Sequence, residues 1–128
     1  MLVLNLVACL AAGCSLVLSS SIFNLAGSLG TRAEIAGELI RLGGTEEQKN
    51  YYLPKISSGE WISCYNLTEP DAGSDANSGK TKAVLTSDGE HYEITGQKMW
   101  ISNAGFAHVF IVFARIEDDK NITGFVFE

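Results

Sequence analysis

The sequence predicts an α+β fold, in which an N-terminal α-helical segment is followed by an antiparallel, β-barrel-like domain that is truncated. Residues 1–60 show helical periodicity without an alternating strand pattern. After Glu60 the period changes to that of β-strands, and short apolar runs are separated by turn residues. The chain ends inside the last such run, which would leave an unpaired edge that folded domains normally protect. We therefore divide it into a helical part, 1–60, and a β part, 61–128.

The helical part contains recognisable start and stop signals. Thr31 is a candidate cap for a helix that Gly43-Gly44 ends. Residues 45–48, Thr-Glu-Glu-Gln, form a capping box that opens another helix, since the hydroxyl and the glutamine can satisfy each other's backbone N–H groups. We expect Pro54 to bend or restart that helix, and Ser58-Gly59 to end the helical part.

The β part is a series of short strands. Asp88-Gly89 is a typical hairpin turn between two of them. The run at 109–115 is almost wholly apolar, which predicts a central strand buried on both sides. Strands are predicted over residues 61–67, 80–87, 91–95, 99–102, 109–115 and 122–128.

Composition excludes several kinds of protein. The 128 residues suit one modest core, and 46% of them are hydrophobic, so the chain is not a disordered acidic tail. A net charge of −6 argues against a nucleic-acid partner. The cysteines Cys9, Cys14 and Cys64 are odd in number, widely spaced and without nearby histidines, which predicts neither a disulfide framework nor a metal site. This cysteine pattern predicts that the protein resides in a reduced, intracellular compartment.

The N-terminus leaves two interpretations open. Residues 1–18 carry no charge, and their length is near that of a membrane span. No basic residue precedes this run, although a signal peptide would normally have one. We favour helices over residues 3–18 and 20–29, the first buried on most sides. The alternative is a non-catalytic, membrane-anchored β module.

The stretch at 67–75, Leu-Thr-Glu-Pro-Asp-Ala-Gly-Ser-Asp, is the most distinctive in the chain. It follows a predicted strand, and Pro70 ends regular pairing there. Gly73 allows a positive φ or the close approach of another group, and Ser74 can turn the chain. A strand that runs into a turn with free backbone N–H groups can hold an anion such as a phosphate. By composition alone, a surface turn is the commoner interpretation.

A second stretch at 96–105, Gly-Gln-Lys-Met-Trp-Ile-Ser-Asn-Ala-Gly, changes that balance. The ordered pair closely resembles the two flavin-contacting signatures of the acyl-CoA dehydrogenase family, at the family's spacing. The resemblance extends from near Glu34 to the last residue, and residues 105–115 look most like the long- and very-long-chain branch. It implies a fragment that holds the end of the N-terminal helical domain and the start of the middle β domain.

The resemblance implies a chemistry. Such enzymes use FAD to dehydrogenate an acyl-CoA thioester to a 2-enoyl-CoA in fatty-acid β-oxidation, with hydride transfer to flavin N5. They pass electrons to an electron-transferring flavoprotein, are homo-oligomers, and occur in the bacterial cytoplasm or, alternatively, the mitochondrial matrix. Acyl-CoA oxidases and some flavin monooxygenases share the architecture, and they remain an alternative.

Part of the flavin site is carried over onto the first stretch. Tyr65, Leu67 and Thr68 match the strand end that contacts the flavin ring. Gly73 and Ser74 match the turn near the FAD pyrophosphate, where Ser74 also matches a contact to the CoA side of the substrate.

The second stretch supplies the remaining cofactor contacts that the resemblance implies. Trp100 matches the aromatic residue that packs against the isoalloxazine, Ile101 its neighbour, and Ser102 the hydroxyl that hydrogen-bonds flavin N5. No catalytic residue is assigned, because the family's glutamate base lies beyond Glu128 and Glu69 matches a structural position. We therefore expect the chain alone to be inactive.

Overall fold

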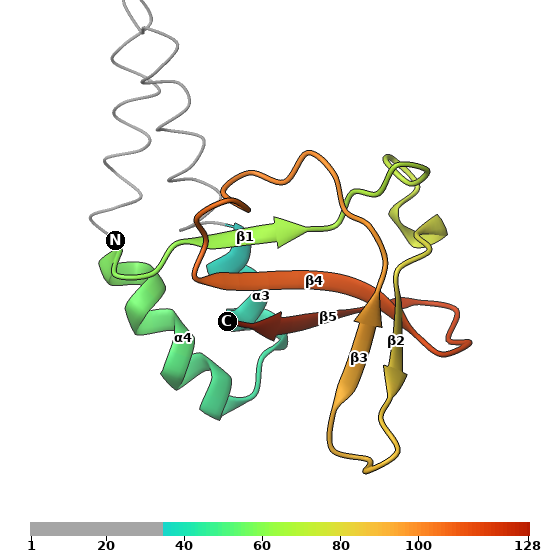
Figure 1. Cartoon of the computed structure of the whole chain (residues 1–128). Helices are drawn as coiled ribbons and strands as arrows, with labels where there is room; N and C mark the ends of the chain where they lie inside the picture. Colours follow the sequence, from blue (N-terminus) through green and yellow to red (C-terminus); the bar gives the residue numbers. More distant parts are fainter. Residues whose placement is uncertain (1–34) are drawn as a thin grey trace, which may run out of the picture. The chain divides into compact units, whose positions relative to one another are not determined.

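The computed structural model describes residues 35–128, and the chain divides into two compact units, Met1–Ile62 and Ser63–Glu128 (Figure 1). The described part of the first unit holds two helices, and the second unit holds a five-stranded sheet. This confirms the α+β class. Neither of the two helices within residues 35–128 is long and apolar enough to cross a membrane. The predicted features outside the described residues are the helices at 3–18 and 20–29, Thr31, Cys9 and Cys14.

Helix α3, Gly37–Gly43, ends at the predicted glycine pair. Gly44 is extended, and its N–H donates to the Ile40 carbonyl over 2.9 Å. A Cβ at Gly44 would lie 2.6 Å from that carbonyl oxygen, so the stop requires a residue without a side chain.

Helix α4, Glu46–Ser58, begins with the predicted capping box and ends at Gly59, which is left-handed with a φ of 83°. The Thr45 hydroxyl accepts from the Gln48 N–H over 3.2 Å, and the Gln48 side chain accepts from the Thr45 N–H over 2.9 Å. Pro54 lies inside the helix and does not restart it, which corrects one of the two expected outcomes. The proline removes one helical hydrogen bond, but Asn50, whose carbonyl loses that partner, is exposed to water.

The sheet is mixed and open, which corrects the expectation of an antiparallel, barrel-like arrangement. Strand β4 pairs in parallel with β1 and β2 and antiparallel with β5, while β2 pairs antiparallel with β3. The long stretch between β1 and β2 makes parallel pairing possible, because both strands then lie along β4 in the same direction. The strands are β1 (Ser63–Asn66), β2 (Lys82–Leu85), β3 (Tyr92–Thr95), β4 (Val109–Ile116) and β5 (Ile122–Phe127).

Strand β4 is central, as predicted, and it organises the sheet. Its first half pairs with β1 and its last residues pair with β2, so both neighbours lie in succession along one edge. Residues 67–81 leave the sheet between them. Val109, Ile111 and Ala114 are buried, whereas the other β4 residues are only half-buried, so the strand is less enclosed than expected.

Two local predictions in the β part have opposite outcomes. The Asp88-Gly89 hairpin is confirmed, with Gly89 at a φ of 74° and β2 paired to β3. The predicted strand at 99–102 is wrong, because this stretch is an irregular loop in which Trp100 has a φ of 58°. A left-handed residue cannot continue a strand.

Candidate functional site

The two distinctive stretches of the sequence meet at the end of β1. The Met99 N–H donates to the Thr68 carbonyl over 3.0 Å, and the Lys98 ammonium donates to the Leu67 carbonyl over 3.1 Å. The loop that leaves β3 therefore returns across the end of β1 before it enters β4 (Figure 1). Residues about thirty positions apart in sequence are brought into direct contact.

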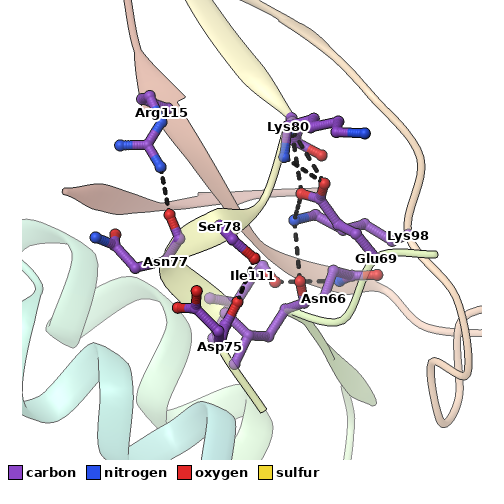
Figure 2. Close-up of polar contacts among 11 residues, drawn as sticks. Asn66, Glu69, Asp75, Asn77, Ser78, Lys80, Lys98, Ile111 and Arg115 are labelled. Carbon is purple, nitrogen blue, oxygen red and sulfur yellow. Dashed lines mark hydrogen bonds and ion pairs between the residues drawn. The ribbon is translucent and has the colours of Figure 1, made fainter. Parts of the chain in front are cut away.

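The carboxylate of Glu69 is at the centre of this junction and is only 6% exposed. It accepts from the Lys98 ammonium over 2.7 Å and from the backbone N–H groups of Lys80 over 2.6 Å and Thr81 over 3.2 Å (Figure 2). Burial by itself raises the pKa of Glu69, but the hydrogen bonds from Lys98, Thr81 and Lys80 outweigh it and lower the pKa to about 2. Glu69 is therefore ionised at neutral pH, and its buried carboxylate holds Lys98, Lys80 and Thr81 together.

The junction is also closely packed. A Cβ at Gly96 would lie 2.7 Å from the Thr81 Cα, so only glycine fits there. At the end of β1, the buried Asn66 amide donates to the Ile111 carbonyl of β4 over 3.1 Å (Figure 2). The end of β1, from which residue 67 continues, is thus tied to the central strand.

Trp100 is presented by a strained backbone. Its φ is 58°, which is costly for a bulky residue, and its side chain is 85% exposed. Asn103 is also left-handed, with a φ of 70°, and its buried side chain donates to the Ser63 carbonyl over 3.1 Å. Strain of this kind persists only where surrounding contacts hold it, and it is common at functional sites. Next to Trp100, Ile101 is half-buried and Ser102 is exposed.

Gly73 and Ser74 lie on an exposed part of the loop between β1 and β2. Gly73 does not have a positive φ, so that predicted reason for a glycine does not apply. A Cβ built on it would project into open space, which leaves room for another group to approach its backbone closely. The short 3₁₀ helix η2, Ala76–Ser78, follows them. Its Asn77 carbonyl accepts from the Arg115 guanidinium over 2.5 Å, which ties the loop to β4 (Figure 2).

The polar groups at the predicted contact positions are available to a ligand. The hydroxyls of Thr68, Ser74 and Ser102 make no hydrogen bond with another residue in 35–128. Tyr65 differs, because its ring packs edge-on against Phe113 of β4 with 5.3 Å between ring centres. Burial raises the pKa of the Tyr65 hydroxyl. Tyr65 is therefore partly a packing residue.

The structure brings Leu67 and Thr68 next to the loop that carries Trp100, Ile101 and Ser102. A shallow depression of about 190 Å³ also lies in this unit, but none of the eight predicted cofactor-binding residues lines it. Its lining residues are Glu69, Pro70, Asp71, Lys80, Thr81, Gly96 and Gln97.

Sequence reasoning did not assign roles to Lys98 and Asn103. A signal existed for Lys98, since a charge beside three apolar residues requires a partner if it is buried. The signal for Asn103 was weaker: asparagine is the residue other than glycine that most readily adopts a left-handed conformation.

Comparison with known proteins agrees with this arrangement. A family model, the acyl-CoA dehydrogenase middle domain, matches residues 64–128. A probable acyl-CoA dehydrogenase of Bacillus subtilis is 50% identical over 93 residues, covering 73% of this chain and 16% of the relative. The human mitochondrial very long-chain specific acyl-CoA dehydrogenase is 46% identical over 101 residues, covering 79% of this chain and 15% of the relative.

A solved structure gives the same result for the fold. The acyl-CoA dehydrogenase from Bacillus anthracis, complexed with FAD, superposes with a TM-score of 0.77 at 45% sequence identity. The match covers 82% of this chain and 18% of that one. The chain thus spans less than a fifth of the length of these relatives. The family model matches almost the whole of the second unit, and these relatives are 45–50% identical to the chain over the matched residues. The chain therefore belongs to the acyl-CoA dehydrogenase family.

Proposed function

We propose that this chain supplies one wall of the flavin site of an FAD-dependent acyl-CoA dehydrogenase. One observation carries the proposal: the Thr68 carbonyl accepts from the Met99 N–H, which places the strand end and the exposed, strained Trp100 side by side. An exposed aromatic and unused hydroxyls are the groups that a planar, hydrogen-bonding cofactor requires. The FAD-bound relative from Bacillus anthracis supports the choice of cofactor.

Each predicted contact has a proposed task. Backbone groups of Tyr65, Leu67 and Thr68 would line the flavin ring. The Trp100 indole would pack against the ring beside Ile101, which would keep water out. The Ser102 hydroxyl would donate a hydrogen bond to flavin N5.

The exposed turn takes the phosphate end of the ligands. Gly73 lets the pyrophosphate approach the backbone, and the Ser74 hydroxyl donates to a phosphate oxygen or to the CoA side of the substrate.

The chemistry divides between cofactor and protein. When bound, FAD would supply the hydride acceptor for the conversion of an acyl-CoA to a 2-enoyl-CoA. The residues of this chain hold and orient ring and thioester and exclude water from them. By the family resemblance, none of the glutamates here corresponds to the base that removes the α proton. We therefore propose that the 128-residue chain alone dehydrogenates nothing.

The wider assignment follows from the same proposal. Residues 1–60 would be the C-terminal part of the helical domain, and residues 61–128 the first part of the middle β domain. An electron-transferring flavoprotein would accept the electrons, the complete protein would be a homo-oligomer, and it would act in the cytoplasm or the mitochondrial matrix. Long-chain acyl-CoA is the first substrate to try, because residues 105–115 resemble that branch.

A transplant tests the function. Residues 64–128 would replace the matching segment of the Bacillus anthracis enzyme, and the purified chimera would be mixed anaerobically with a long-chain acyl-CoA. We expect bound flavin and loss of its oxidised absorption band, with no such loss for the 128-residue chain. A folded chimera without flavin would contradict the proposed site, whereas bound flavin that no acyl-CoA of any length reduces would contradict the proposed reaction.

A further inference from the structure

The loop that carries Trp100 is fastened at both ends to β1 and its continuation. At one end, the Lys98 ammonium binds the Leu67 carbonyl over 3.1 Å and the Glu69 carboxylate over 2.7 Å. The Met99 N–H binds the residue between them, Thr68, over 3.0 Å. Two neighbouring loop residues thus contact three successive residues of the first stretch. The Lys98 side chain is only 12% exposed, so this end is sheltered from water.

The other end is fastened by Asn103. Its side-chain amide donates over 3.1 Å to the carbonyl of Ser63, which begins β1 and is fully buried. Asn103 itself is 8% exposed and left-handed. One attachment point is therefore the first residue of β1, and the other lies just past the end of β1.

The segment between the two attachments is short. Residues 98 and 103 are five steps apart in sequence, and the Ala104 N–H donates to the Ile101 carbonyl over 3.4 Å, which closes a turn just after Trp100. The left-handed backbone at Trp100 and Asn103 therefore lies between contacts that hold it on both sides. The Trp100 side chain is 85% exposed, so its own packing does little to hold it.

From this geometry we propose that Lys98 and Asn103 are positioning residues, which hold residues 100–102 against β1 and so fix the Trp100 indole and the Ser102 hydroxyl for the flavin. The inference rests on the proposed function for the identity of its ligand, but the fastening of the loop by Lys98 and Asn103 is independent of that function. Neither residue is among the proposed flavin contacts. Both act through the backbone of the residues between them.

The test uses the full 128-residue chain and two variants, Lys98→Met and Asn103→Gly. Glycine keeps the left-handed backbone of Asn103 accessible while it removes the amide. The matched controls are Lys80→Met, which removes an exposed ion pair to Asp71, and Asn77→Gly, which removes a similar bond to the Lys120 carbonyl. Amide hydrogen exchange is measured for every residue, followed by an NMR titration with FAD.

We expect the hydrogen-bonded amides of Met99 and Ala104 to exchange at least about fivefold faster in both variants. The β5 amides should keep their rates in Asn103→Gly. In Lys98→Met, which also leaves the Glu69 carboxylate without its counter-charge, the β5 amides should accelerate by a smaller factor than those of Met99 and Ala104. The controls should match the unmodified chain. The FAD dissociation constant should rise about tenfold in the two variants.

Three outcomes overturn the inference. Unchanged exchange at Met99 and Ala104 contradicts the fastening, and equal acceleration throughout Ser63–Glu128 shows a merely structural role. If local exchange is faster but the affinity for FAD is unaltered, the two residues fasten the loop but do not position it for the flavin. By contrast, an unmodified chain with no saturable FAD-induced shifts contradicts the proposed function itself.

Discussion

Replacing Glu69 with glutamine tests how strongly the buried ion pair holds the two stretches together. The substitution keeps the size of the side chain and one oxygen acceptor, but it removes the charge. Glu69 is 6% exposed and Lys98 12% exposed, so the variant leaves a largely buried ammonium without its counter-charge. Removing one partner of such a pair is strongly destabilising.

The magnitude follows from the pKa of Glu69, which is lowered from 4.5 to about 2. At about 1.4 kcal/mol per pH unit, the ionised carboxylate contributes about 3 kcal/mol to the free energy of unfolding at neutral pH. Because the folded pKa lies below the unfolded one, this stabilisation is fully present above about pH 4.5 and is lost as the pH falls towards 2. About 3 kcal/mol is a large share of the 5–15 kcal/mol typical of a domain.

The assay is urea denaturation at pH 7, 4.5 and 3, followed by the Trp100 indole NMR signal. We expect Glu69→Gln to lower the free energy of unfolding by about 2–3 kcal/mol at pH 7 and the difference to shrink at pH 3. Asp71→Asn, which breaks the exposed pair with Lys80, serves as control and should have little effect. A difference under about 0.5 kcal/mol at pH 7, or one that does not shrink with acid, would refute the reasoning.

Three further substitutions are informative. Gly96→Ala should destabilise the β unit by about 2 kcal/mol in urea denaturation, because the Thr81 backbone cannot yield; an unchanged midpoint would show that the junction is looser than described. Trp100→Gly should leave stability unchanged or raise it by up to roughly 1 kcal/mol, since it relieves the left-handed strain, yet FAD-induced NMR shifts should vanish; a loss above about 2 kcal/mol would mean that the indole is a packing residue. Thr45→Ala should cost about 1 kcal/mol in thermal unfolding followed by circular dichroism, because the capping box is lost; no change would make the cap dispensable.

The features that were predicted correctly depend on short stretches of sequence. The capping box at Thr45 and the hairpin at Gly89 each depend on a few adjacent residues, so their local chemistry determined them. The central place of β4 followed from its apolar run. Strand partners are a different matter, since parallel pairing of β1 with β4 depends on residues more than forty positions apart.

The site shows the same division. The motifs pointed to a flavin wall through the family resemblance, but the contact between Lys98 and Glu69 joins positions 29 apart and has no local signal. The left-handed Trp100 was missed because its apolar neighbours, Met99 and Ile101, suggest a strand. The bond from Met99 to Thr68 and the bond from Asn103 to Ser63 override that preference.

The most direct test of the central claim is an NMR titration of the isotope-labelled 128-residue chain with FAD, which detects even weak binding. We expect saturable shifts that cluster at residues 67–68, 73–74 and 100–102, with none at the distant hairpin turn around Gly89. Shifts that never saturate, or that cluster away from these segments while the chain remains folded, would contradict it.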